Sequence, residues 1–501
     1  MLTTASPLTS SLPVPPRAQR CRHSTHLNVN VNVIYYNKGR TWAIETIGAR
    51  ASSEKWVRDM MNSEWLLYRY HVPYPTRPKT AGTEGKQCEA DALGRTISSS
   101  STATSHSAMD ATRGSVSSTS TQSTRDDAAA SSEPFILRHG RRYLKGMQQY
   151  PLPCDLPELQ RQNLHTLLAT SVLGRALGST PSPQNPPKKV LELACGSAYW
   201  TAVCHDFLSG LGYEHVSYTG LDIVPLAGDL QRQGIDWKFV QHDLRKPPLP
   251  FDDDEFDIVV MKDMSLVVPI GALSQRILDE ATRVLKSGGT LEVWETDHVI
   301  RSILPHPPPP PGKSPQEHAC AQTTRTFLIS PITPFTEVQN KYLQDSNAWI
   351  EEAFDRRKLS PTPCARISQM LLQETETLHS VGDRRVAIPL GELRWERELA
   401  AAEPPKPKRR ESESTRPNPK KASVVLDAGT LTEEQAALRY TALLVVVQMI
   451  ESLEPLLKEV SGKNQEEWQR WWAGLMGNLL EQKGASSGEC LEVGVWWCKK
   501  V

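Results

Sequence analysis

The sequence lacks three features that would point to whole classes of protein. Its 501 residues carry 57 basic and 57 acidic side chains, so no global field favours nucleic acid or a basic partner. Its nine cysteines include no C-x-x-C pair, and such spacing indicates neither a metal site nor a disulfide framework. No apolar run approaches the roughly 18 residues that span a bilayer. We therefore expect an intracellular protein without nucleic-acid, metal or membrane binding.

Acidic residues are also missing from the first 44 positions, which hold five Lys or Arg and many Ser and Thr. This composition is permitted for a mitochondrial transit peptide, and a disordered tail is the alternative. The basic segment 406–410, followed by Lys420 and Lys421, has the form of a two-part nuclear localisation signal. Glu411 and Glu413 suit an ordinary linker equally. We expect a cytoplasmic protein, with the nucleus or the mitochondrion as alternatives.

Composition divides the chain into a leader and a single domain. The Ser/Thr/Ala tract at 96–132 has almost no large apolar residue to offset chain entropy, so residues 1–133 are predicted to be a largely disordered leader. Residues 134–501 are predicted to form the domain. Its expected parts are a cofactor-binding core at 188–298, a helical and proline-rich substrate-side insertion at 299–380, a disordered basic linker at 401–423, and C-terminal helices with a last strand at 431–499.

Within the domain, short apolar runs alternate with segments of helical periodicity. Asp155 and Pro157 mark the start of a helix at 156–173. Repeated strand–helix units of this length predict a doubly wound α/β fold, with a mostly parallel sheet covered by helices on both faces. The expected strands are 189–193, 218–223, 237–242, 256–261, 290–294, 386–390 and 489–499, and the other expected helices are 199–211, 274–285, 347–358, 365–379, 431–460 and 466–482.

The first of these strands runs into a turn of very small residues and then into a helix. Such residues let a cofactor approach the backbone, where the helix presents free N–H groups. A dinucleotide turn wants a small residue at its last position, and Tyr199 would stand there. The alternative spacing, small-x-small-x-small, is met by Ala194, Gly196 and Ala198, with Glu192 two residues before them.

Three further segments follow in order along the chain. Asp222 ends the second strand of the core, where a carboxylate can accept both hydroxyls of a ribose. Asp243 ends the third strand, and a D-L-x-x-x-P-L-P-F run begins there. The segment 283–290 reads R-V-L-K-S-G-G-T, and its glycines are expected to end a helix in a left-handed turn. Each segment is weak alone, but all of them stand where open α/β sheets bind ligands.

Together these segments resemble the class I S-adenosylmethionine-dependent methyltransferases. Flanking segments look like those of fungal small-molecule or regulatory members. The resemblance implies a Rossmann-like seven-stranded sheet whose last strand is antiparallel, and 490–498 is similar to that strand. It also implies S-adenosyl-L-methionine as the cofactor, with Glu192 supporting its ammonium and Asp243 contacting its adenine. The cofactor-binding residues that we infer are Glu192, Ala194, Gly196, Ser197, Asp222, Ile223, Asp243, Leu244, Lys262 and Tyr143.

The sequence departs from the family pattern because two of the three turn glycines are alanines. If either position requires a positive φ, alanine costs about 1 kcal/mol there. Methyl transfer needs a base only when the acceptor is protonated, and Asp263 and His298 are our candidates. The acceptor, a small molecule or a protein, is not identified. A regulatory protein that keeps the fold without turnover and a nicotinamide-dependent oxidoreductase are the alternatives.

Overall fold

The computed structural model describes residues 32–38, 41–47, 134–402 and 431–501. The chain divides into two compact units, Met1–Tyr70 and His71–Val501. In the first, β1 (Asn32–Lys38) and β2 (Thr41–Ile47) pair as an antiparallel hairpin. The Ser/Thr-rich tract and nearly all of the basic linker lie outside the described residues, so the predicted disorder there stays a prediction.

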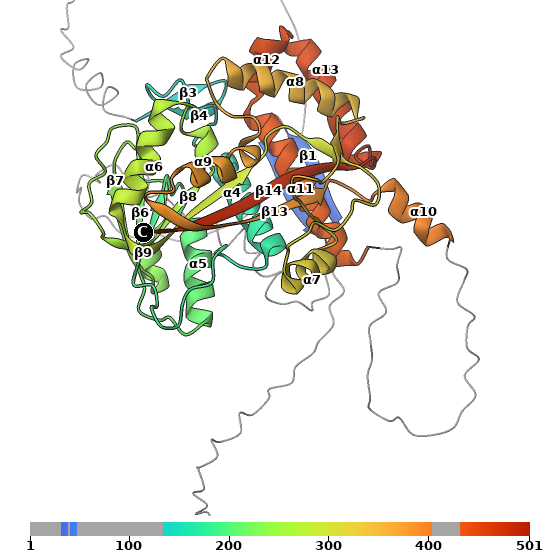
Figure 1. Cartoon of the computed structure of the whole chain (residues 1–501). Coiled ribbons are helices and arrows are strands. Elements are labelled where there is room, and N and C mark those ends of the chain that lie inside the picture. The colour runs from blue at the N-terminus through green and yellow to red at the C-terminus, as the bar shows by residue number, and fades with distance from the viewer. Residues whose placement is uncertain (1–31, 39–40, 48–133, 403–430) are drawn as a thin grey trace, which may run out of the picture. The chain divides into compact units, whose positions relative to one another are not determined.

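The second unit is built on a large mixed sheet in the order β7-β6-β5-β8-β9-β14-β13-β11 (Figure 1). The first five strands of this order are parallel, as the alternating pattern predicted. Strand β14 is antiparallel to both of its neighbours. The strands are β5 (Lys189–Leu193), β6 (Ser217–Asp222), β7 (Asp236–Gln241), β8 (Phe256–Lys262), β9 (Leu285–Thr296), β11 (Phe327–Leu328), β13 (Leu378–Pro389) and β14 (Glu489–Lys500).

Helices cover both faces of this sheet because successive strand residues point to opposite sides. Val190 of β5 belongs to one apolar cluster and Leu191 to another. The cluster of Val190 includes residues of α4 (Leu156–Leu173), α5 (Tyr199–Gly210) and α11 (Glu433–Ser452). The cluster of Leu191 includes residues of α6 (Ala272–Val284) and α9 (Ile367–Gln373). The doubly wound architecture is therefore confirmed.

Several smaller elements complete the second unit. A hairpin of β3 (Phe135–Arg138) and β4 (Arg141–Leu144) precedes α4. Two short strands, β10 (Arg301–Ile303) and β12 (Phe335–Thr336), pair at the edge near β14. The remaining helices are α7 (Pro315–Thr324), α8 (Lys341–Asp355), α10 (Arg394–Ala402), α12 (Glu454–Ser461) and α13 (Gln465–Met476).

The structure corrects the sequence at four places. Helix α6 ends in an extended Leu285, and the left-handed residue is Gly288, inside the segment assigned to β9. The long helix predicted at 431–460 is two helices, α11 and α12, because the chain bends at Leu453. Helix α9 is shorter than expected, since residues from Leu378 onward pair with β14. The sheet also has three short strands beyond the seven that the resemblance implied.

Among the described residues, no single helix combines the length and apolar character needed to cross a membrane. Helices α11 and α12 meet that test only as a pair, bent by 66°.

Candidate functional site

The turn that follows β5 holds three residues in the left-handed region of backbone space. They alternate along the chain: Ala194 has a φ of 53°, Gly196 of 52° and Ala198 of 56°. The turn therefore needs a positive φ at both positions where the family pattern has glycine and this chain has alanine. Left-handed geometry costs an L-residue with a Cβ about 1–2 kcal/mol. The sequence predicted strain only if these positions required a positive φ, and this strain is present at both alanines.

We predict that Ala194→Gly stabilises the protein by about 0.5–1 kcal/mol, because the relief of left-handed strain exceeds the chain-entropy cost of a new glycine. Ala202→Gly, in the interior of α5, is the control, and it should lose about 1 kcal/mol. Urea denaturation of both variants measures the difference. Destabilisation by Ala194→Gly as large as that of the control would show that the turn is unstrained.

Asp222 at the end of β6 fixes this turn from the neighbouring strand. Its Oδ2 accepts a hydrogen bond from the Gly196 backbone N–H at 2.7 Å, and its Oδ1 accepts one from the Ile223 N–H at 2.7 Å. Burial raises the pKa of the carboxyl, although both backbone bonds favour the ionised form. Each oxygen keeps a further lone pair for a ligand.

Glu192 lies beneath the same turn and is buried. Its Oε2 accepts a hydrogen bond of 2.6 Å from the Thr201 hydroxyl on α5. Burial raises the pKa of Glu192 to about 7. Because the Glu192 carboxylate is poorly solvated, a cationic ligand would stabilise its ionised form.

A cavity, which we call the turn cavity, opens over this region. Besides Glu192 and the turn, it is lined by Tyr150 and Trp200, by residues of α4 and by the end of β8. Of the residues predicted to bind a cofactor, those that line it are Glu192, Ala194, Gly196, Ser197 and Lys262.

The remaining predicted residues do not line the turn cavity. The Asp243 carboxylate binds the Arg245 guanidinium through two bonds of 2.9 Å, and Leu244 beside it is buried. Ile223 holds Asp222 through its backbone N–H. Tyr143 lies on β4, where burial raises its pKa to about 12. The roles of Asp243, Leu244 and Tyr143 therefore stay predictions, and Asp222 reaches the cavity only through Gly196.

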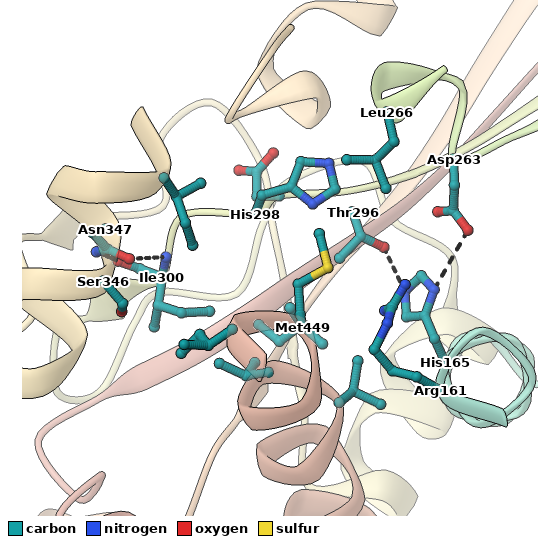
Figure 2. Close-up of a pocket in the computed structure, with 16 residues that line it drawn as sticks. Arg161, His165, Asp263, Leu266, Thr296, His298, Ile300, Ser346, Asn347 and Met449 are labelled. Atoms are coloured by element: carbon teal, nitrogen blue, oxygen red, sulfur yellow. Dashed lines mark hydrogen bonds and ion pairs between the residues drawn. The ribbon is translucent and has the colours of Figure 1, made fainter. Parts of the chain in front are cut away.

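A second cavity lies beside the first, and Figure 2 shows the residues that line it. We call it the helix cavity, because α4, α8 and α11 supply many of its walls. The two cavities share Arg161, Asp263 and Leu266 as lining residues. The two cavities therefore lie next to each other at Asp263.

At this junction, His165 of α4 is held at both ring nitrogens. Its Nε2 lies 2.7 Å from the Thr296 hydroxyl, and its Nδ1 lies 3.6 Å from Oδ2 of Asp263 (Figure 2). Burial lowers the pKa of His165, so the imidazole is neutral near pH 7. Burial alone would raise the pKa of Asp263, but the Lys262 ammonium and the imidazole hold it well below its usual value.

The other predicted base, His298, lines the helix cavity from the segment after β9. Its Nε2 lies 3.1 Å from the Ser265 hydroxyl, which itself donates to Glu295 at 2.7 Å. Burial lowers the pKa of His298 to about 3 and raises that of Glu295 to about 8. The structure thus brings both predicted bases, Asp263 and His298, to the same cavity.

Sequence reasoning missed Arg161 and His165. Both lie in the segment that forms α4, where the leucine spacing was used only to predict a helix. They stand four residues apart and so share one face of the helix. The Arg161 guanidinium donates twice to Glu158, at 2.9 and 2.7 Å, and Ser452 of α11 donates to the same carboxylate. A buried Arg-x-x-x-His pair was the signal available.

One group among the described residues has the donor atoms for a metal ion. Asp297, Cys364 and Glu492 are buried and place ligand atoms within 4.8 Å of one another. Two guanidinium groups, those of Arg301 and Arg385, already pair with Glu492. Because these cations neutralise the cluster, we assign it no metal.

Comparison with known proteins bears on this geometry. Residues 190–289 match the family model described as a methyltransferase domain, and this segment runs from β5 to the start of β9. Over this segment the chain is similar to methyltransferase domains. Its matched part contains the strained turn, Asp222, Asp243 and Asp263, whereas His165 and α11 lie outside it.

The chain also resembles curated proteins. The phthiotriol/phenolphthiotriol dimycocerosates methyltransferase of Mycobacterium tuberculosis is 32% identical over 130 residues, which cover 22% of this chain and 42% of that protein. The protein of that name from Mycobacterium bovis matches equally. The chain thus spans less than half the length of these relatives.

Two solved structures show the range of similarity. The YcgJ protein of Bacillus subtilis is 13% identical, with 68% of this chain and 98% of that chain covered and a TM-score of 0.29. The N-methyltransferase NodS of Bradyrhizobium japonicum, solved with S-adenosyl-L-homocysteine, is 17% identical, with 28% and 63% covered and a TM-score of 0.20. Scores this low add nothing to the assignment.

Proposed function

We propose that the protein transfers a methyl group from S-adenosyl-L-methionine, bound in the turn cavity, to an acceptor bound in the helix cavity. The observation that carries the proposal is the junction of the two cavities at Asp263. Displacement at a methyl carbon requires donor and nucleophile to approach in line from opposite sides. Two adjoining cavities that share Asp263 and Leu266 would place a donor and an acceptor next to each other.

The residues of the turn cavity fit the donor. When bound, S-adenosyl-L-methionine supplies a methyl group already activated on a sulfonium. The buried Glu192 carboxylate would support the ammonium of its methionine part, and the small residues of the turn let its backbone approach. Asp222 does not line the cavity, so its proposed contact with the ribose hydroxyls requires the donor to extend past Gly196, where the carboxylate keeps free lone pairs. The hydrogen bonds from the Gly196 and Ile223 N–H groups to Asp222 hold this narrow bend in place against the strain at its alanines.

The protein's own part in the reaction is to position the reactants and to exclude water. Helix α11 covers the helix cavity with Val445, Val446, Met449 and Ile450. An apolar cover of this kind keeps water from the reacting groups. Asn347 of α8 donates to the Ile300 carbonyl at 2.7 Å and accepts from its N–H at 3.0 Å, which fixes the opposite wall.

Titration calorimetry with S-adenosyl-L-methionine and with NAD tests the proposal. We expect binding of the methyl donor and none of NAD, because Tyr199 stands where a dinucleotide turn needs a small residue. Preferential binding of NAD would overturn the proposal. Donor binding without transfer of label to any component of a cell extract would favour a regulatory protein that keeps the fold.

Donor affinity should rise about tenfold between pH 5.5 and 7, and Glu192→Gln should flatten this rise. An ammonium ligand prefers the ionised carboxylate, and burial sets the pKa of Glu192 at about 7. Below that pH the carboxyl is protonated and affinity is lost; above it the full interaction is present. Calorimetry across this pH range measures the effect. Equal slopes for the variant and the unaltered protein would remove Glu192 from the donor site.

A further inference from the structure

The helix cavity has a strongly polar end, and Ser346 and Asn347 are polar residues elsewhere in its wall. The polar end, at the junction with the turn cavity, presents His165, Asp263, Thr296 and His298 (Figure 2). The rest of the wall is mostly apolar, with Ile300, Ile350, Val445, Val446, Met449, Ile450 and Leu491. Resting on the function proposed above, we propose that the acceptor is a small molecule with an apolar body and a hydroxyl group, methylated at that oxygen, and that His165 receives the hydroxyl proton.

The walls of the cavity argue for a small molecule. They come from α4, the segment after β8, the segment from β9 to Ile300, α8, α11 and β14, so protein surrounds the site on many sides. Arg161 and His165 at its floor are only 6% and 5% exposed. A folded protein surface cannot reach so deep a polar end, whereas a compact molecule can place its reactive group there.

The charges at the polar end select the reactive group. Both neighbouring cations are already paired, Arg161 with Glu158 and Lys262 with Asp263. A carboxylate acceptor would find no free cation at this end and would face the ionised Asp263. An ammonium acceptor would pair with Asp263 as a cation and would have no lone pair for the methyl group. A neutral hydroxyl can donate to an imidazole without burying a charge.

The hydrogen bonds of His165 prepare it for this proton. Asp263 is ionised and can only accept, so the Nδ1–H of His165 points to it and Nε2 carries the lone pair. In the structure this lone pair meets the Thr296 hydroxyl at 2.7 Å. The acceptor hydroxyl either takes the place of the Thr296 hydroxyl at Nε2 or passes its proton to Nε2 by way of the Thr296 hydroxyl. Asp263 then stabilises the imidazolium that forms.

The step balances in atoms and charge. The acceptor oxygen forms a bond to the methyl carbon of the sulfonium donor, and the carbon–sulfur bond breaks with its electron pair remaining on sulfur. The proton of the hydroxyl passes to Nε2 of His165. The products are a methyl ether, a neutral thioether and an imidazolium, which returns its proton to solvent.

Three probes with a naphthalene body test the acceptor class: 2-naphthol, 2-naphthylmethylamine, which is an ammonium near pH 7, and 2-naphthoate. With S-adenosyl-L-homocysteine present, we expect 2-naphthol to bind at least about tenfold more tightly than the other two, a difference of about 1.4 kcal/mol. Absence of 2-naphthol binding, or equal binding of the amine or the carboxylate, overturns the acceptor class. Binding of S-adenosyl-L-homocysteine alone is measured first, and its absence would refute the proposed function itself.

His165→Asn tests the base, with the exposed His379→Asn as the matched control. Loss of a general base should lower the rate of 2-naphthol methylation about 10²–10⁴-fold, while the control keeps the rate.

The groups that face His165 are Asp263, Lys262, Arg161 and His298, and burial keeps its imidazole neutral from pH 7 to 9. The unaltered protein should therefore show a flat rate over this range. The variant, which can use only the naphtholate anion, should gain about tenfold per pH unit. A flat profile in both proteins would overturn the role of His165.

Discussion

Asp222→Ala is expected to weaken the binding of S-adenosyl-L-methionine at least about 100-fold, which corresponds to about 2.7 kcal/mol. The carboxylate holds the N–H groups of Gly196 and Ile223 at 2.7 Å each, so its removal releases the strained turn as well as the proposed ribose contact. Calorimetry with S-adenosyl-L-methionine and with S-adenosyl-L-homocysteine measures the loss.

The control for this experiment is Asp236→Ala. Asp236 begins the neighbouring strand β7, is exposed and lies at the opposite end of the parallel sheet from the turn. It should bind the donor as the unaltered protein does. Unchanged affinity in Asp222→Ala would overturn the ribose assignment, and a similar loss in the control would show that the measured effect is not specific to the site.

Arg439→Ala is expected to lower the free energy of unfolding by about 3–5 kcal/mol, because it leaves a buried carboxylate without its partner. The Arg439 side chain of α11 is 1% exposed and donates to both oxygens of Glu396 on α10, at 2.6 and 2.9 Å. It also donates to the carbonyls of Gly391 and Arg325, at 3.0 and 2.8 Å. Urea denaturation followed by tryptophan fluorescence measures the change.

Arg394→Ala, on the helix α10 that also carries Glu396, provides the comparison. Arg394 pairs with Glu398 at 3.2 Å, but both side chains are exposed, and such pairs contribute about 0–1 kcal/mol. A large effect at Arg439 and a small one at Arg394 would show that burial decides the energy. Similarly small effects of both substitutions would mean that the Glu396 carboxylate becomes hydrated when Arg439 is removed. Since α11 also roofs the helix cavity, we expect the Arg439 variant to lose acceptor binding before it loses donor binding.

The amino-acid sequence by itself determined the sheet core and the turn. Helix α4 begins and ends at the predicted residues, and β5 does so too, because their signals are local: a capping Asp155 for the helix and a short apolar run for the strand. The strained turn was readable for a similar reason. Small residues at alternate positions directly after a strand indicate a bend that side chains cannot occupy, and the positive φ angles of Ala194 and Ala198 follow from it.

Only the tertiary structure decided which side chains meet at the reaction centre. His165 and Thr296 are 131 residues apart and come within 2.7 Å because α4 packs on the sheet near the end of β9. The roof of the helix cavity comes from α11, beyond a linker that separates it from the core in sequence. The bend between α11 and α12, and the pairing of β13 with β14, likewise depend on contacts between distant segments. Local patterns carry no information on such contacts, because they arise from the packing of whole elements and not from the spacing of residues within one.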